Sequence, residues 1–518
     1  MQIFAKKLLI DQNGKATNFR LHTLQFPHMR ALHFAWLSFM VAFMSWYAIP
    51  PIVYHIAEDL GISSVEIYDS NMAAVSITII ARLIVGPLCE RFGPRRVMAL
   101  ILICGAIPCG MTGLITNGAG LIGLRCVIGI LGATFVPCQF WTTQMFSPSV
   151  LGTANAMSAG WGNMGAGITY LIMPAIYDGI LSHTTNSIAW RTTFIIPCCI
   201  CLIVGAMDFF CATDTPHGDW LELRRQEQNK ATTTTSSKST TTTTSDVSTT
   251  EATDAATQQK TTTISIEKSA LTDVEKSGGE KGVLSDVEET ESLQGVKKNE
   301  SAKDAFVAFV RVLVNPAVLI MIVHYACSFG TELAVDNVIG QVFREKFNLD
   351  NSTASYIGSV FGLLNIISRL SGGLFSDYLA KHFHIPGRIF AHCTCMTLEG
   401  VFLIGFSFGL INMHTAIILM IFFSFFVQAV CGSTFGIVPF IDPLNNGKIM
   451  GIVGAGGNLG GLIFNLMFRE FAGDFETAFL CLGCIALGSG LLGNAVLRVQ
   501  GKMIWHIFGG KHVPTNTL

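Results

Sequence analysis

Two arginines stand in apolar surroundings, at corresponding places in the two halves of the chain. Arg82 and Arg369 each begin an Arg-x-x-x-Gly-x-x-x-acid pattern, which ends at Glu90 in one copy and at Asp377 in the other. An arginine inside hydrocarbon costs from about 3 to more than 10 kcal/mol unless it faces a cavity or a partner. A guanidinium is planar and forked, so it suits a planar oxyanion better than lysine would. The pair therefore predicts one anion site built from both halves.

The alternative is that each arginine pairs with a carboxylate inside the membrane. Neither arginine has an acid three or four residues away along its own segment. The apolar stretches hold few other candidates, namely Glu332, Asp336 and Glu399. An ion pair and an anion site both stay open at this point.

Two glycine-rich stretches also recur, at residues 159–165 and 454–461, and each contains one asparagine. Small residues let membrane helices approach closely, and the glycines expected to do so include Gly162, Gly165, Gly457 and Gly460. A primary amide is costly in hydrocarbon without a partner. Asn163 and Asn458 are therefore expected to bond either across a helix contact or directly to the substrate.

Composition places most of the chain in a lipid bilayer. Half of the residues are hydrophobic, 13% are charged and the mean hydropathy is +0.50, whereas a soluble domain carries about 25% charged residues. The net charge of −2 argues against a nucleic-acid partner. The 15 cysteines lack metal-ligand spacing, so neither a metal nor another cofactor is expected.

Twelve apolar stretches are long enough to cross about 30 Å of hydrocarbon, six in each half of the chain. We therefore predict an all-α membrane protein with two six-helix bundles. The predicted spans are 32–54, 67–90, 96–116, 119–145, 150–177, 190–211, 312–337, 353–379, 387–410, 414–440, 448–470 and 475–498. The predicted domains are an N-terminal segment (1–31), a first bundle (32–215), a central loop (216–304), a second bundle (305–498) and a tail (499–518).

The short loops predict the orientation, because basic residues gather on the cytoplasmic side. Lys6 and Lys7 precede the first span, and Arg95 and Arg96 follow the second. Loops on the other side carry more acids. Both termini and the central loop are therefore expected in the cytoplasm.

The central loop has low complexity: residues 232–244 are nearly all Thr, Ser and Lys. Such a segment cannot bury enough apolar surface to fold, so disorder is expected. Thr272 and Ser285 precede acids, and lysines stand nearby. Kinases and the ubiquitin machinery are candidate partners here, and a plain tether is the alternative.

Residues 86–96, between the second and third spans, resemble the loop signature of the major facilitator superfamily, with Glu90 where Asp is usual. We expect the charged residues of this signature to form a cytoplasmic latch between helices. Arg125 resembles a second motif of this superfamily, on the fourth span. A structural contact is expected for it, or a side chain that reaches the membrane interface.

The two glycine-rich stretches resemble the paired nitrate signatures of the nitrate/nitrite porter family, and Arg82 and Arg369 match its two substrate-binding arginines. The Thr- and Ser-rich loop looks like the fungal branch, near the yeast high-affinity nitrate transporters. The resemblance implies aromatic rings around the anion, for each of which core packing is the alternative: Tyr325, Phe329, Phe135, Phe435, and either Phe39 or Phe43.

The resemblance implies a secondary transporter, not an enzyme, that imports nitrate and nitrite across the plasma membrane. Import into a negative cell opposes about 2.3 kcal/mol per charge per 100 mV, so electrically driven uptake needs at least two cations per anion. Protons are the implied cations, with Glu332, His324 and Asp336 as candidate carriers. A nitrate/nitrite exchanger and an organic-anion carrier of the same fold are the alternatives.

Overall fold

The computed structural model describes residues 5–226, 307 and 310–507. These residues are almost entirely helical, and the described part contains isolated β-bridges but no strand. Thr272, Ser285 and the neighbouring lysines of the central loop lie outside the described residues.

Helices of the first half begin and end at turn-forming residues. A capping box starts α3: the Ser63 hydroxyl accepts from the Glu66 N–H, and a Glu66 oxygen accepts from the Ser63 N–H at 2.9 Å, which satisfies two free backbone donors. Gly93, with φ of +87°, ends α3 and lets α4 begin at once. The helices are α1 (His28–Trp46), η1 (Pro50–Ile52), α2 (Val53–Leu60), α3 (Ser64–Phe92), α4 (Pro94–Met111), η2 (Thr112–Leu114), α5 (Gly118–Ile128), η3 (Gly129–Thr134), α6 (Phe135–Met145), α7 (Pro148–Leu181), α8 (Asn186–Thr193) and α9 (Ile195–Cys211).

Helices of the second half follow the same plan. Asp350 caps α14 by accepting from the Thr353 N–H at 2.8 Å, and Asp474 caps α18 in the same way. The helices are α13 (Pro316–Phe347), α14 (Asn351–Leu363), η4 (Leu364–Ile366), α15 (Ser368–Gly409), α16 (Met413–Ile437), η5 (Val438–Phe440), η6 (Pro443–Asn445), α17 (Asn446–Glu470), α18 (Phe475–Val496) and η7 (Ile504–Ile507).

Eleven helical stretches of the described chain are long and apolar enough to cross a membrane. One of them, Asn351–Gly409, has 59 residues and would be roughly 90 Å long as a straight helix, three times the hydrocarbon thickness. The backbone breaks inside it at His384, with φ of 54° and ψ of −135°. This stretch therefore makes two spans, which agrees with the twelve predicted.

Several spans are interrupted near the middle of the bundle. The 3₁₀ turn η3 separates α5 from α6 within the fourth predicted span, and η4 stands just before α15 within the eighth. Such turns leave backbone carbonyls without their usual helical donors. In the sequence, η3 ends immediately before Phe135, and η4 ends three residues before Arg369.

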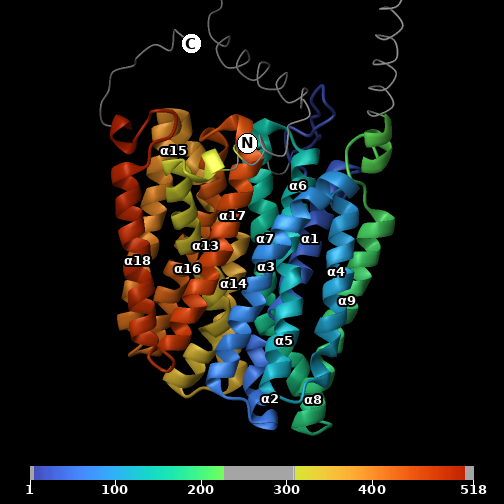
Figure 1. The fold of residues 1–518 in the computed structure, drawn as a ribbon, viewed down its shortest axis with the longest axis vertical. Coiled ribbons are helices and arrows are strands. Elements are labelled where there is room, and N and C mark those ends of the chain that lie inside the picture. Colours follow the sequence, from blue (N-terminus) through green and yellow to red (C-terminus); the bar gives the residue numbers. More distant parts are fainter. Residues whose placement is uncertain (1–4, 227–306, 308–309, 508–518) are drawn as a thin grey trace, which may run out of the picture. The chain divides into compact units, whose positions relative to one another are not determined.

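The helices run between two ends of the bundle (Figure 1). The segment before α1 and the α3–α4 turn lie at one end, here called the upper end. The helices α2 and α8 lie at the other, the lower end. The two halves of the chain meet where α7 packs on α14 and α17 packs on α3.

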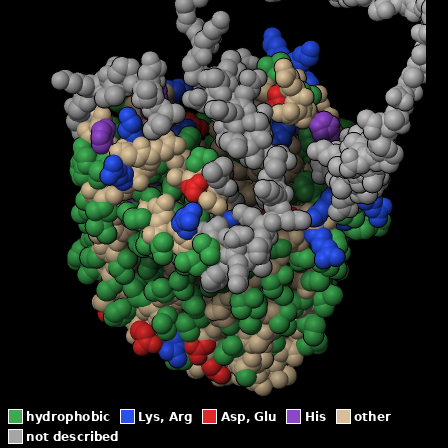
Figure 2. All heavy atoms as spheres, turned by 45° about the horizontal axis from the view of Figure 1, so that its top comes forward, with side chains coloured by type: hydrophobic (Ala, Val, Ile, Leu, Met, Phe, Trp, Pro, Cys, Tyr) green, Lys and Arg blue, Asp and Glu red, His purple; other side chains and the backbone are tan. Residues whose placement is uncertain are grey.

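The outer surface of the bundle carries a band of hydrophobic side chains, with Lys and Arg gathered at the upper rim (Figure 2). Large apolar residues are exposed there, such as Phe210 at 79% and Phe408 at 65%. Exposed apolar area of this extent is unusual for a protein in water. It is the surface expected to contact lipid.

Candidate functional site

Arg82, on α3, is buried at the centre of the bundle, with 6% of its surface exposed. Its Nε and Nη2 both donate to the carbonyl oxygen of Gly132, at 3.1 and 3.0 Å. Gly132 lies in η3, so the break in the fourth span supplies this acceptor. Nη1 reaches the Gly454 carbonyl of the second half at 3.5 Å. Within the described residues no carboxylate forms an ion pair with Arg82.

Arg369, on α15, does have a carboxylate partner. Its Nη2 donates to Oε2 of Glu332 at 2.6 Å, and the side chains are 1% and 0% exposed. The ion-pair alternative of the sequence analysis therefore applies to Arg369 and not to Arg82. The two arginines, equivalent in sequence, have different electrostatic surroundings.

The second carboxylate oxygen of Glu332 is held by two amides. Oε1 accepts from Nδ2 of Asn163 at 3.1 Å and from Nδ2 of Asn365 at 2.8 Å. Asn163 belongs to the first glycine-rich stretch, on α7, so this bond joins the two halves. Sequence analysis did not name Asn365, although it stands four residues before Arg369, a spacing that puts both on one helix face.

The ring of Phe329 lies beside both guanidinium groups. The Arg82 Cζ is 5.3 Å and the Arg369 Cζ 5.7 Å from its centroid, within the range of cation–π attraction. Tyr325 stacks on Phe329 at 5.1 Å, and Arg82 also lies 5.0 Å from the Phe135 ring. The aromatic residues suggested by the family resemblance thus lie together around the two arginines.

Two more rings complete this group. Phe435 packs edge-on against Tyr325 at 5.2 Å and lies 6.1 Å from Phe135, across the two halves. Of Phe39 and Phe43, the two candidates on α1 for a ring in this group, only one contacts another ring of the group among the described residues. Phe39 packs against Phe135 at 5.9 Å, whereas Phe43 packs against Trp46 and Tyr47.

The glycines of both stretches lie at close contacts. A Cβ on Gly162 would be 1.9 Å from the Phe39 ring, and one on Gly457 would be 2.6 Å from Tyr325 and 2.8 Å from Phe329. These two glycines therefore give room to rings of the site. Gly165 and Gly460 instead face backbone, because their Cβ atoms would be 2.1 Å from the Met40 oxygen and 2.2 Å from the Ala326 oxygen.

The remaining predicted residues make no hydrogen bond to either arginine within the described residues. Asn458 donates to the Gly454 carbonyl of its own helix at 3.1 Å, the same oxygen that Arg82 Nη1 reaches at 3.5 Å. His324 bonds His392 at 3.0 Å and the Ser489 carbonyl at 2.9 Å, within the second half. Asp336 is buried one helical turn below Glu332, and its backbone oxygen accepts from Tyr170 at 2.7 Å. Among the contacts of the described residues, Glu332 is the one proton-carrier candidate of the three that bonds an arginine.

The lower part of the interface between the halves is closed by polar contacts. Tyr54 donates to Glu345 at 2.7 Å, and Arg469 pairs with Asp69 at 2.6 Å. Arg125 is buried and donates to Asn337 of the other half at 2.9 Å. It therefore makes a structural contact and does not reach the membrane–water interface. On the upper side, a small pocket reaches Arg369 and is also lined by Gln139, Asn155, Ala156, Ala159, Cys431, Gly432 and Phe435.

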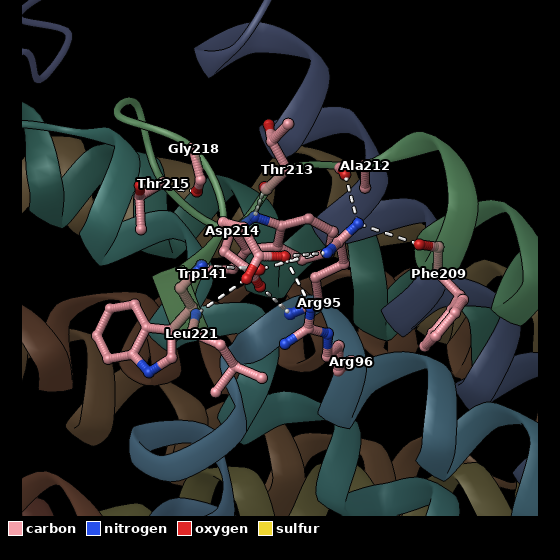
Figure 3. A network of polar contacts seen from close by, with 12 residues as sticks. Arg95, Arg96, Trp141, Phe209, Ala212, Thr213, Asp214, Thr215, Gly218 and Leu221 are labelled. Atoms are coloured by element: carbon pink, nitrogen blue, oxygen red, sulfur yellow. Dashed lines mark hydrogen bonds and ion pairs between the residues drawn. The ribbon is translucent and has the colours of Figure 1, made fainter. Parts of the chain in front are cut away.

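The loop signature spans the α3–α4 turn at the upper end (Figure 1), and Figure 3 shows the polar network that Arg95 and Arg96 form there. Arg95 binds both Asp214, at 3.4 Å, and Asp219, at 2.7 Å, and Arg96 binds Asp219 at 2.8 Å. Burial raises the pKa of the Asp214 carboxyl, an effect that Arg95 opposes. A Cβ on Gly93 would be 2.8 Å from Asp214. The signature holds the chain that follows α9, and among the described residues it forms no hydrogen bond or ion pair with the two arginines.

Fold and family agree on the class of protein. Residues 35–465 match the model of the Major Facilitator Superfamily. The structure is similar to that of a bacterial homolog of the human lysosomal transporter Spinster, with a TM-score of 0.59, 11% sequence identity, and coverage of 90% of this chain and 97% of that one. The chain is therefore a membrane transporter of the Major Facilitator Superfamily and not an enzyme.

Similar proteins of known family show to which family of the superfamily the chain belongs. The chain is 32% identical over 470 residues to High affinity nitrate transporter 2.7 of Arabidopsis thaliana, covering 90% of this chain and 82% of that one. It is 28% identical over 468 residues to the Nitrate/nitrite transporter NrtP of Nostoc punctiforme, covering 88% and 90%. The chain belongs to the nitrate transporter family of this superfamily, which confirms the resemblance drawn from the paired arginines and glycine-rich stretches.

Proposed function

We propose that this chain imports nitrate and nitrite across the plasma membrane by alternating access, driven by proton symport. The observation that carries the proposal is the arginine pair. Arg82 and Arg369 come from opposite halves and lie over one ring, that of Phe329. Two planar, forked cations between aromatic rings suit a small, planar, weakly hydrated oxyanion. The names of the relatives, nitrate and nitrate/nitrite transporters, support the same substrates.

Charge distribution supports an orientation with the upper end in the cytoplasm. The upper rim is rich in Lys and Arg (Figure 2), whereas the α2 segment at the lower end carries Glu58 and Asp59. Basic residues favour the cytoplasmic side. Both termini would then be cytoplasmic, and the Arg369 pocket would lie on the cytoplasmic side of the site.

The interface between the halves supports alternating access. Polar contacts such as Tyr54–Glu345 close its lower part, and the pocket beside Arg369 lies on its upper side. The anion site is shared between the halves. A rocking motion of one half against the other would open the site to the lower side and close it to the upper side.

Proton symport is proposed because the membrane potential opposes anion entry by about 2.3 kcal/mol per 100 mV. A carrier for nitrate alone would release it from the cell. Nitrate is too strong an acid to bind a proton itself at cellular pH. A protein group must therefore hold the proton.

The test uses the purified protein in liposomes with an imposed pH gradient and voltage. We expect nitrate and nitrite to accumulate when the outside is acidic, and chloride to compete weakly. Equal transport of chloride would contradict the planar-oxyanion site. Uptake that requires nitrite inside the liposome, and ignores the pH gradient, would show an exchanger instead of a symporter.

A further inference from the structure

We propose that Glu332 is the group that links proton binding to anion binding, by competing with the anion for Arg369. Ionised, Glu332 holds Arg369; protonated, it releases Arg369 to the substrate. This inference rests on the proposed nitrate–proton symport and names the residue and the contact that produce it.

Arg369 has few other partners. The hydrogen bond from Nη2 to Glu332 Oε2, at 2.6 Å, is the single hydrogen bond it makes to the described residues, and its buried Nε has no acceptor. Arg82, in contrast, is held by the Gly132 carbonyl through two nitrogens. The orientation of Arg369 therefore depends on Glu332. An anion at the arginine pair must share this guanidinium with the carboxylate or replace it.

The charges at the site favour replacement of Glu332 by the anion at Arg369 only when a proton binds to Glu332. With Glu332 ionised, Arg369 is neutralised and Arg82 is the one cation of the pair without an acidic partner among the described residues. A proton on Glu332 leaves two uncompensated cations in a site with almost no water contact. A buried unpaired charge is unfavourable, and an anion relieves it. Proton and anion therefore each strengthen the binding of the other, and this linkage is reciprocal.

The two carboxylate oxygens have different neighbours. Asn163 of α7 and Asn365 of η4 donate hydrogen bonds to Oε1. A protonated, uncharged carboxyl group can still accept both of these bonds through its carbonyl oxygen. The Cys431 thiol of α16 lies 3.7 Å from Oε2, beside Arg369. The proton therefore belongs on Oε2. The other titratable groups that interact electrostatically with Glu332 are Tyr325 and Asp336 of α13, Tyr47 of α1 and Glu399 of α15.

The proton balance of one cycle follows. Water on the lower side supplies a proton to Oε2, the ion pair with Arg369 opens, and the anion binds both arginines. After the site opens to the upper side, the anion leaves, Arg369 returns to Glu332, and the proton passes to water on that side. The Asn163–Glu332 bond spans the two halves, so their relative motion also changes the surroundings of this carboxylate. Glu332 accounts for one proton per cycle.

The test compares wild type with Glu332→Gln, which keeps the shape and the acceptor oxygen but cannot ionise. Nitrate is added to the purified full-length proteins in weakly buffered detergent solution, and proton uptake and nitrate affinity are measured across pH. Wild type should take up a proton on binding, and its nitrate affinity should fall as the pH rises, by at most about tenfold per pH unit for one linked proton. In Glu332→Gln we expect one proton fewer to be taken up per nitrate bound, and a nitrate affinity that depends less on pH. In liposomes this variant should exchange nitrate for nitrate but should not accumulate it when a pH gradient is imposed.

The matched control is Glu399→Gln, because Glu399 is equally buried but bonds no arginine of the described chain. It should retain the wild-type proton uptake and pH profile. The inference about Glu332 is overturned if Glu332→Gln keeps the wild-type proton uptake and pH profile, or if Glu399→Gln loses them. Proton symport itself would still stand in either case. Wild type that binds nitrate without any pH dependence overturns symport as well. If Glu332→Gln does not fold, Glu332→Asp should keep the pH dependence with a displaced midpoint, and an unchanged midpoint would count against Glu332.

Discussion

Arg82 and Arg369 share a neighbour, since their Cζ atoms lie 5.3 and 5.7 Å from the centroid of the same Phe329 ring. Each arginine comes from a different half of the chain, and each is buried. Their difference lies in their partners. Arg82 donates to backbone carbonyls, whereas Arg369 donates to a carboxylate. One half thus supplies a cation with no acidic partner among the described residues, and the other supplies a cation whose charge is balanced by Glu332.

Replacing either arginine by lysine should weaken nitrate binding. Lysine keeps the charge but loses the fork, and a hydrogen bond to a charged group contributes about 1.5–3 kcal/mol. We expect Arg82→Lys and Arg369→Lys each to raise the Kd for nitrate about ten- to a hundredfold. Binding to the purified variants measures this. Arg91→Lys, exposed at the upper end, is the control, and affinity near wild type in Arg82→Lys would refute the two-guanidinium site.

Adding one methyl group to Gly162 or Gly457 should impair transport. The new Cβ would lie 1.9 Å from the Phe39 ring or 2.6 Å from Tyr325, so the rings must move. Overpacking of this kind costs about 1–3 kcal/mol. The matched controls are Gly152→Ala and Gly451→Ala, on the same helices, where nothing lies within 4 Å. Uptake per molecule at the surface should fall in the first pair alone; equal effects in both pairs would show that these contacts are not limiting.

Arg95 and Arg96 should differ in their effect on stability, although they are adjacent. Arg95→Ala removes the cation beside Asp214, whose side chain is 0% exposed, and an unpaired buried charge costs about 3–5 kcal/mol. Arg96 is 28% exposed and, within the described part of the chain, has one ion pair, to Asp219, so Arg96→Ala should cost less than about 1 kcal/mol. Thermal unfolding of the purified variants tests the ranking. A larger loss for Arg96→Ala would contradict the network of Figure 3.

Asp350 should make stability depend on pH in the acidic range. Hydrogen bonds from Thr353 lower the pKa of this carboxyl in the folded protein. A lowered pKa means that the stabilisation is present above the pKa of the unfolded chain, about 3.9, and is lost as the pH falls through the folded value. Asp350→Ala should cost about 1 kcal/mol at neutral pH and little at pH values below the folded pKa.

Asp350→Asn provides the control for this prediction. Asparagine caps a helix about as well as aspartate does but does not titrate. Its unfolding midpoint should match wild type at neutral pH and should lack the acidic decline due to this residue. An identical decline in both proteins would assign the pH dependence to other groups.

The sequence by itself determined the twelve spans and singled out the two arginines that lie beside the Phe329 ring in the structure. Hydropathy over about 20 residues is a local property, so each span could be found without knowing its neighbours. Two arginines and two Gly-Asn stretches were visible because they are costly in lipid and because they repeat. The repeated pattern was enough to single out Arg82 and Arg369, whereas the aromatic residues beside them came from the family resemblance.

Tertiary structure decided which side chains touch. Glu332, Asp336 and Glu399 were equal candidates to pair with an arginine, and Glu332 alone does so within the described residues. Phe39 and Phe43 are one helical turn apart, yet Phe39 reaches Phe135. The physical reason is that rotation and depth of each helix relative to its neighbours are set by packing across the bundle. A difference of one turn or of a fraction of a rotation moves a side chain from one partner to another, and no local pattern records it.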